Sequence, residues 1–210
     1  MSLLRSALFY SAEALAWRRL DKRVLAHLQE RVSPTAIRPQ YGDLWRLYRA
    51  VRRRRPRVVW EFGAGWSTSF LAQGLADNGS GRLYSMDADQ SWANHAQSLL
   101  PPWLKAEIRF APVTLVDVRG ERGWRHSNRP EDAMPDLIYL DGPSGMKECT
   151  GCADIPDIEN GLEPGCLVII DGRPGTTAML RRTLRRSWKS WEERGPLGNK
   201  PIQGMFELVS

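Results

Sequence analysis

Short apolar runs alternate with segments of helical periodicity from residue 57 onward. The runs have the length and composition of buried strands and cover 57–62, 82–86, 106–110, 136–140, 166–170 and 206–209. Between them, apolar side chains recur three or four residues apart, which predicts helices over 67–75, 92–100 and 176–187. This alternation predicts βαβ units and a mainly parallel sheet with helices on both faces.

The first 54 residues carry only helical patterns. Apolar residues fall on one stripe through residues 1–31, which predicts a helix that ends before Ser33-Pro34, and a second helix is predicted over 41–54. We therefore expect an N-terminal helical extension over 1–39, followed by one α/β domain over 40–210. The extension could cap the domain, pair two copies into a homodimer, or lie on a membrane surface.

The segment 112–135 gives the weakest signal. Residues 113–118 have the composition of a strand, whereas 120–135 are polar and are predicted to form a loop that shapes a substrate pocket.

Composition and charge exclude several classes of protein. Hydrophobic residues make up 42% and charged residues 26% of 210 residues, which is typical of a globular domain. No uncharged apolar run approaches the roughly 18–20 residues that cross a bilayer, and no secretory signal is evident, so we expect a cytoplasmic protein without a transmembrane segment. The net charge of +6 comes from arginines spread along the chain, which favours solvated helix faces over a nucleic-acid surface. Cys149 and Cys152 form a single Cys-x-x-Cys pair, too few ligands for a structural zinc.

Acidic residues and glycines follow four of the predicted strands. They are Glu61 to Gly65, Asp87, Asp141 and Asp171. Because parallel strands end at one edge of a sheet, where such folds bind ligands, we expect these features to meet.

The first of these features has the pattern of a nucleotide-binding turn. Gly63-Ala64-Gly65 stands between a strand and a helix, where glycine lets the backbone approach a ligand and where Ser67 or Thr68 could cap the helix. Asp87 follows Gly65 by 22 residues, a spacing that suits a carboxylate binding ribose hydroxyls. Thr68 stands where the NAD fingerprint has its third glycine, which disfavours an NAD-dependent oxidoreductase.

These motifs together resemble class I S-adenosylmethionine-dependent methyltransferases, in the Ser-Thr variant of small-molecule O-methyltransferase-like proteins. The matching segments within residues 40–210 are 61–68, 86–92, 136–143 and 161–171. The resemblance implies a Rossmann-like, doubly wound sheet of about seven strands, the last one antiparallel. It also implies S-adenosylmethionine as cofactor and a small-molecule acceptor, methylated on oxygen. The implied cofactor-binding residues are Glu61, Gly63, Ala64, Gly65, Ser67, Thr68, Asp87, Ala88 and Asp141.

The catalytic residues are less defined. Asp141 and Asp171 are candidates for the reacting centre, and Arg173 could bind an acidic substrate or form an ion pair. The two acids could also hold Mg²⁺, but Gly172 stands where metal-dependent relatives place a further ligand, so a metal is not expected. His126 and Lys147 are weaker candidates, expected at the surface. A methyltransferase-like binding protein without catalysis and an RNA methyltransferase remain alternatives.

Overall fold

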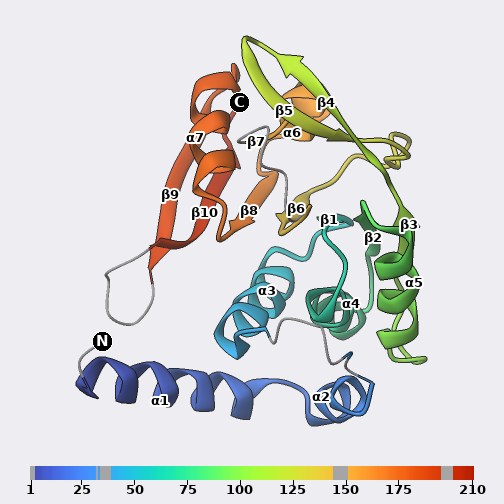
Figure 1. The fold of residues 1–210 in the computed structure, drawn as a ribbon, viewed down its shortest axis with the longest axis vertical. Helices are drawn as coiled ribbons and strands as arrows, with labels where there is room; N and C mark the ends of the chain where they lie inside the picture. Colours follow the sequence, from blue (N-terminus) through green and yellow to red (C-terminus); the bar gives the residue numbers. More distant parts are fainter. Residues whose placement is uncertain (1–2, 32, 34–38, 144–150, 195–200) are drawn as a thin grey trace.

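The computed structural model describes residues 3–31, 33, 39–143, 151–194 and 201–210. Its centre is a seven-stranded sheet (Figure 1), and across the sheet the order is β3 (Glu107–Phe110), β2 (Arg82–Asp87), β1 (Val58–Phe62), β6 (Leu137–Leu140), β8 (Leu167–Asp171), β10 (Pro201–Leu208) and β9 (Trp188–Arg194). The first five strands are parallel, and β10 runs antiparallel to both β8 and β9. The predicted α/β fold is confirmed.

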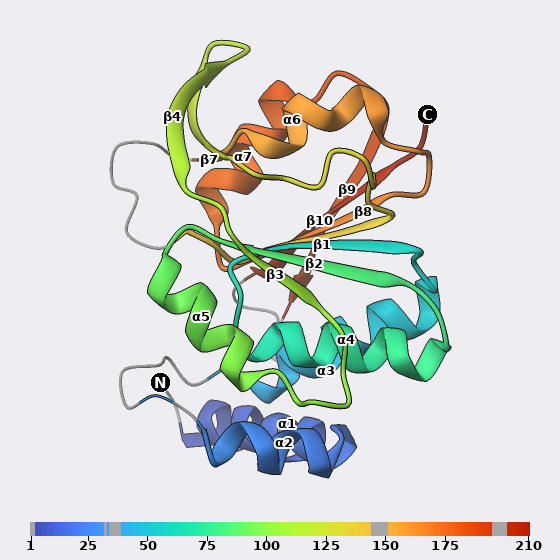
Figure 2. The same ribbon diagram turned by 90° about the vertical axis from the view of Figure 1, so that its right-hand side faces the viewer.

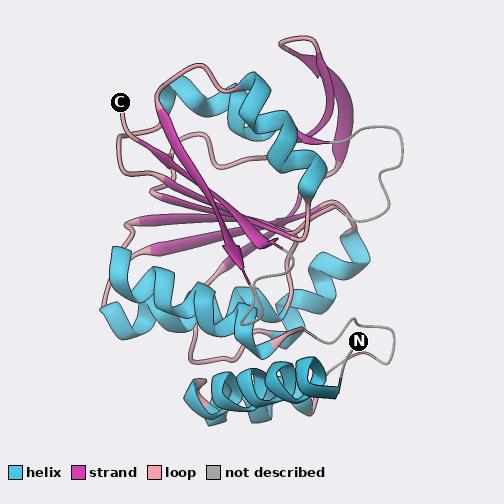
Figure 3. Ribbon diagram, turned by 90° about the vertical axis from the view of Figure 1, so that its left-hand side faces the viewer, coloured by secondary structure: helices cyan, strands magenta, loops and turns pink. Residues whose placement is uncertain are grey.

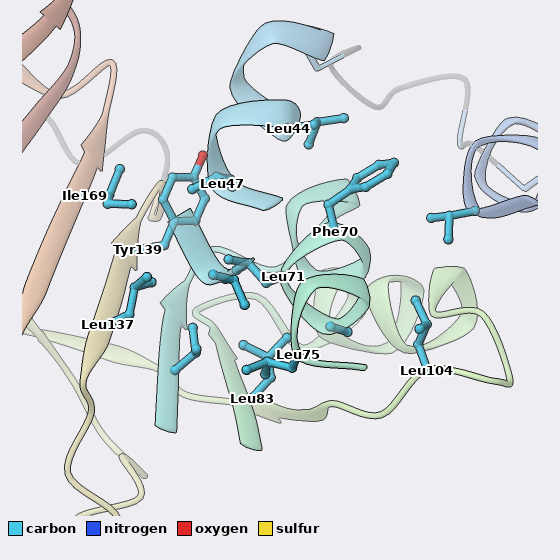
Figure 4. Close-up of a cluster of buried hydrophobic side chains, with 14 of the residues drawn as sticks. Leu44, Leu47, Phe70, Leu71, Leu75, Leu83, Leu104, Leu137, Tyr139 and Ile169 are labelled. Carbon is cyan, nitrogen blue, oxygen red and sulfur yellow. The ribbon is translucent and has the colours of Figure 1, made fainter. Parts of the chain in front are cut away.

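Three helices cover one face of the sheet: α3 (Tyr41–Arg54), α4 (Trp66–Asn78) and α5 (Gln90–Leu99), all on the same side in Figure 2. The core on this face joins inward side chains of α3 and α4, such as Leu47 and Phe70, to alternate strand residues such as Leu137 (Figure 4). These three side chains are fully buried, and each such burial contributes about 1.5–3 kcal/mol. The core therefore fixes α3 and α4 over the strands that precede the acidic residues.

The opposite face is covered by α6 (Asp154–Ile158), α7 (Pro174–Thr183) and a small second sheet, so that helices flank the main sheet on both sides (Figure 3). The second sheet has the order β4 (Val113–Val118), β5 (Glu121–His126) and β7 (Gly151–Cys152). The strand over 113–118 was predicted, but the loop prediction was wrong for 121–126. This polar segment becomes a strand because β4 supplies an antiparallel partner and Trp124 is buried in the second core.

The N-terminal extension is two helices where the pattern predicts one. They are α1 (Leu3–Arg19) and α2 (Lys22–Gln29), separated at Leu20 and Asp21. Asp21 is extended, and its carboxylate accepts a hydrogen bond from Val24 N at 2.9 Å, so it caps α2 and ends the preceding helix. Leu25 and Leu28 of α2 join the first core, which ties the extension to the rest of the molecule. None of the described helices is long and apolar enough to cross a membrane.

The predicted helix over 176–187 is also shorter. It ends at Thr183, and the missed strand β9 begins at Trp188. The reason is the buried carboxylate of Glu159, which accepts hydrogen bonds from the backbone N–H groups of Arg185 and Arg186 at 2.8 and 2.9 Å. These contacts turn the chain out of the helix.

Candidate active site at the carboxyl edge of the sheet

Several of the predicted site residues lie side by side at the carboxyl ends of the parallel strands. Phe62 is paired with Met86 and with Leu140, Leu140 with Ile170, and Asp171 with Gln203. The residues one step further therefore stand side by side along one edge of five neighbouring strands, in the order Asp87, Gly63, Asp141, Asp171 and Gln203. We refer to these five residues as the carboxyl-edge row. Alternation along each strand places them on the face covered by α3 and α4.

The glycine turn is locked to its neighbours by its backbone. Gly63 has a positive φ of 98°, and a Cβ there would lie 2.7 Å from the backbone N of Gly142 in the loop after β6. Gly63 N also donates to Met86 O at 2.8 Å, which holds the turn against β2. Gly65 differs, because a Cβ at this position would meet nothing within 4 Å. The turn is thus closed at Gly63 and open at Gly65.

Side chains complete the support of the turn. The indole Nε1 of Trp92, on α5, donates to Ala64 O at 2.6 Å, and the Thr68 hydroxyl accepts from Gly65 N at 2.9 Å. Thr68 therefore caps α4 from inside the helix, which is one of the roles predicted for it.

Glu61 lies beneath the turn and is completely buried. Its carboxylate accepts hydrogen bonds from the hydroxyls of Ser67, Thr68 and Ser85 at 2.5, 2.6 and 2.6 Å. Burial raises the pKa of Glu61 to about 7, against the effect of the three donors. The Glu61 side chain therefore ties the first turn of α4 to β1 and β2, and its contact with a cofactor stays a prediction.

Asp87 is the last residue of β2, and its side chain is held by two backbone N–H groups. One carboxylate oxygen accepts from Ala64 N at 3.0 Å and the other from Asp89 N at 2.9 Å. Each oxygen keeps further acceptor capacity. Burial raises the pKa of Asp87, and the two N–H donors oppose this shift. Ala88 follows directly and is half-buried.

Asp141 and Asp171 follow Gly63 in the row. The Tyr139 hydroxyl donates to an Asp171 carboxylate oxygen at 3.0 Å, and its ring packs beside Leu47 of α3 (Figure 4). The Asp141 side chain is 48% exposed, yet desolvation and then the charge of Asp171 raise its pKa above the usual range. Burial likewise raises the pKa of Asp171, with the Tyr139 hydroxyl opposing.

Arg173 forms the ion pair that was one of its two predicted roles. Its guanidinium lies 3.7 Å from the Asp141 carboxylate and donates to the backbone oxygens of Asp141 and, at 2.8 Å, Pro143. Arg173 therefore fastens the loop after β6 to the loop after β8.

Asp43 and Arg46 of α3 were not predicted as site residues. Asp43 is buried and pairs with Arg46, and desolvation and then the charge of Asp171 raise its pKa to about 6. A signal was present, because Asp43 lies four residues before the buried Leu47 and therefore falls on the apolar face of the helix.

The remaining candidates lie elsewhere. His126 is buried, which corrects its expected surface position, and its Nδ1 lies 2.7 Å from an Asp154 carboxylate oxygen. Its ring packs on Phe62, on the opposite face of the sheet from the row. Lys147 and Cys149 fall outside the described residues. Within the described ranges, no three His, Cys, Asp or Glu residues are grouped so that they could hold a metal ion.

Comparisons with known proteins identify the family of the chain. The family described as a methyltransferase domain matches residues 60–172, which is more than half of the chain. No curated protein sequence matches the chain.

Solved structures share the fold at low sequence identity. The O-methyltransferase TomG from Streptomyces achromogenes, in complex with S-adenosylmethionine, is 18% identical with a TM-score of 0.57, over 100% of this chain and 99% of that one. An O-methyltransferase from Bacillus cereus with S-adenosylhomocysteine is 16% identical with a TM-score of 0.57, over 96% and 100%. The Podospora anserina methyltransferase PaMTH1, with the same ligand, is 12% identical with a TM-score of 0.63, over 100% and 98%.

The residues that match the family, 60–172, include four of the seven strands of the central sheet and most of a fifth, β1. The predicted Rossmann-like fold and the predicted resemblance to class I methyltransferases are both confirmed. The chain belongs to the methyltransferase-domain family.

Proposed function

We propose that the protein uses S-adenosylmethionine to methylate a hydroxyl group of a small molecule. The observation that carries the proposal is the carboxyl-edge row. In this row the glycine turn and Asp87, the predicted ribose-binding carboxylate, lie beside the carboxylates of Asp141 and Asp171. The structural neighbours crystallised with S-adenosylmethionine or S-adenosylhomocysteine support the choice of cofactor.

The residues at one end of the row fit this cofactor. The backbone at Gly65 is open, and both Asp87 oxygens can accept further hydrogen bonds, as a pair of ribose hydroxyls requires. The residues that would hold the cofactor are Gly63, Ala64, Gly65, Asp87, Ala88 and Asp141. When bound, S-adenosylmethionine supplies a methyl group activated by a positively charged sulfonium.

The residues at the other end of the row suit the acceptor. A hydroxyl must lose its proton to become a methyl ether, and a carboxylate whose pKa is raised toward neutrality suits this proton transfer. Asp171 has that raised pKa because it is buried, although hydrogen bonds from the side chains of Tyr139 and Gln203 oppose the shift. We assign Asp171 as the proton acceptor and Asp141, held by Arg173, as the residue that orients the reacting groups.

The alternatives have less support. Several arginines of the basic C-terminal region are engaged within the protein: Arg181 with Glu192, Arg182 with Glu121 and Arg186 with the backbone of Glu159. This engagement disfavours a basic RNA-binding face on α7. Thr68 at the third glycine position disfavours NAD, and its hydroxyl is committed to Glu61 and Gly65.

The extension is proposed to serve assembly. Leu8, Tyr10 and Leu15 of α1 are exposed, with 44%, 70% and 48% of their surface open. We propose that residues 1–39 pair two copies, and that 40–210 form the cofactor-binding domain. Sedimentation of the full chain and of a Leu8→Glu, Leu15→Glu variant tests this, because only the former should dimerise. The cytoplasmic location stays a prediction of the sequence.

Transfer of a labelled methyl group from S-adenosylmethionine tests the main proposal. A panel of phenols and alcohols should reveal turnover, and Asp171→Asn should lower kcat by about 100-fold or more while leaving S-adenosylhomocysteine affinity within about twofold. Asp117→Asn, which removes an exposed charge on β4, is the matched control. Cofactor binding without turnover on any acceptor would favour the binding protein that lacks catalysis.

A further inference from the structure

Tyr139 of β6 brings a hydroxyl group into the first core. Only 2% of its surface is exposed, and in the sheet it is paired with Glu61 of β1 and with Ile169 of β8. Its ring packs beside Leu47 of α3 (Figure 4). A phenylalanine ring would fill the same space, so packing alone does not account for the hydroxyl group.

The partner of this hydroxyl is the acid that we assign as proton acceptor. The Tyr139 hydroxyl donates a hydrogen bond to one carboxylate oxygen of Asp171 at 3.0 Å. Burial, and then the charges of nearby acids, raise the pKa of Tyr139 well above its usual range, so the phenol keeps its proton and remains a donor. The bond therefore connects the buried core to the reacting end of the row.

Five other groups influence the Asp171 carboxylate: two arginines, two acids and one amide. They are Arg46 and Asp43 on α3, Asp141 after β6, Arg173 after β8 and Gln203 on β10. The arginines and the amide lower the pKa of Asp171, whereas the two acids and Asp171 repel one another. Each arginine is ion-paired with one of the other two acids and not with Asp171. Tyr139 therefore supplies a direct contact with Asp171 that neither arginine supplies.

We propose that Tyr139 is a positioning residue for methyl transfer, whose hydroxyl holds the Asp171 carboxylate ionised and in a fixed orientation. This inference rests on the proposed function, in which Asp171 accepts the proton of the acceptor. A hydrogen bond to one oxygen restrains the carboxylate and leaves acceptor capacity for the substrate hydroxyl. A donor to the ionised form also lowers the pKa of Asp171, so the base is available at a lower pH than burial alone would allow.

Tyr139→Phe tests the hydrogen bond, because it removes the hydroxyl and keeps the ring. The pH profile of kcat/KM for labelled methyl transfer is compared with that of the wild type between pH 5 and 9. We expect the midpoint to rise by about one pH unit, with a rate loss of about tenfold below the midpoint and of at most about threefold at pH 9. Affinity for S-adenosylhomocysteine should stay within about twofold.

Tyr48→Phe is the matched control. It removes a tyrosine hydroxyl that donates to the exposed carboxylate of Asp77 at 2.7 Å, so its pH profile should coincide with that of the wild type. A rate loss in Tyr139→Phe that is equal at every pH would show a structural role only and would overturn the inference.

Titration of Asp171 itself gives a readout that needs no turnover. Its carboxyl carbon-13 resonance is identified by its absence in Asp171→Asn, and its midpoint should rise by about one pH unit in Tyr139→Phe only. If Tyr139→Phe does not fold, a difluorinated tyrosine at the same position, a stronger donor, should lower the midpoint instead. An unchanged midpoint would overturn the inference. A wild type that does not bind S-adenosylhomocysteine would instead refute the proposed function, so the two failures are distinguishable.

Discussion

The two ends of the carboxyl-edge row are built on different principles. At the cofactor end, the buried acids are already satisfied by the protein: three hydroxyls bond Glu61 and two backbone N–H groups bond Asp87. At the acceptor end, Asp43, Asp141 and Asp171 repel one another. The first end is preorganised by backbone geometry. At the second end, Asp43 and Asp141 are ion-paired with Arg46 and Arg173, and burial raises the pKa of all three carboxyl groups. Substitutions that change the backbone shape should therefore be most damaging at the cofactor end. Changes in the charge of the carboxyl groups should be most damaging at the acceptor end.

The largest effect is expected from Gly63→Ala. The new Cβ would meet the backbone of Gly142 at 2.7 Å, at a φ of 98° that L-residues rarely adopt. We expect a loss of about 3 kcal/mol of stability and of measurable cofactor binding. Gly65→Ala is the matched control, because its Cβ meets nothing within 4 Å. It should keep the melting temperature and weaken only cofactor binding. Equal melting temperatures for the two variants would contradict the closed and open description of the turn.

A second effect concerns the pH dependence of stability. The folded pKa of Glu61, about 7, lies above its ordinary value of 4.5, so the stability linked to this group is present below pH 4.5 and is lost as the pH rises toward 7. The change amounts to at most about 3 kcal/mol. Glu61→Gln removes this titration, so chemical denaturation should show a flatter stability profile between pH 4.5 and 7. Identical profiles would mean that Glu61 stays ionised in the folded protein.

The carboxylates at the acceptor end should make the rate of methyl transfer depend on pH. Proton acceptance requires an ionised carboxylate, and the pKa values of Asp141 and Asp171 are raised. We expect kcat/KM to rise about tenfold for each pH unit below the governing pKa and to level off above it. Binding of S-adenosylhomocysteine, followed by calorimetry over the same range, should change far less. A rate independent of pH between 5 and 8 would exclude these acids as proton acceptors.

The smallest effect is expected from Trp92→Phe, next to the glycine turn. Trp92→Phe removes the hydrogen bond from the indole Nε1 to Ala64 O while keeping most of the ring. A hydrogen bond of this kind contributes about 1 kcal/mol, which corresponds to a roughly fivefold loss of cofactor affinity. Turnover at saturating cofactor should not change. A fall in kcat with unchanged cofactor affinity would show that α5 acts on the acceptor end instead.

The same contrast explains what the sequence could predict. The cofactor end lies within one short segment plus Asp87, so glycine spacing and strand order were enough to find it. The acceptor end assembles α3, β6, β8 and β10, and Asp43 and Gln203 reach it only through tertiary packing. Periodicity located the parallel strands because they are apolar throughout. It missed 121–126 and 188–194, whose polar residues become strands through pairing with β4 and β10.

Calorimetric titration of the wild type and Asp87→Ala with S-adenosylmethionine, S-adenosylhomocysteine and NAD tests the central claim most directly. The account predicts micromolar binding of the first two ligands, no binding of NAD, and at least a 100-fold loss of affinity in Asp87→Ala, with Asp117→Asn unaffected. A folded wild type that binds neither S-adenosyl ligand, or an Asp87→Ala variant that binds them as well as the wild type, would contradict it.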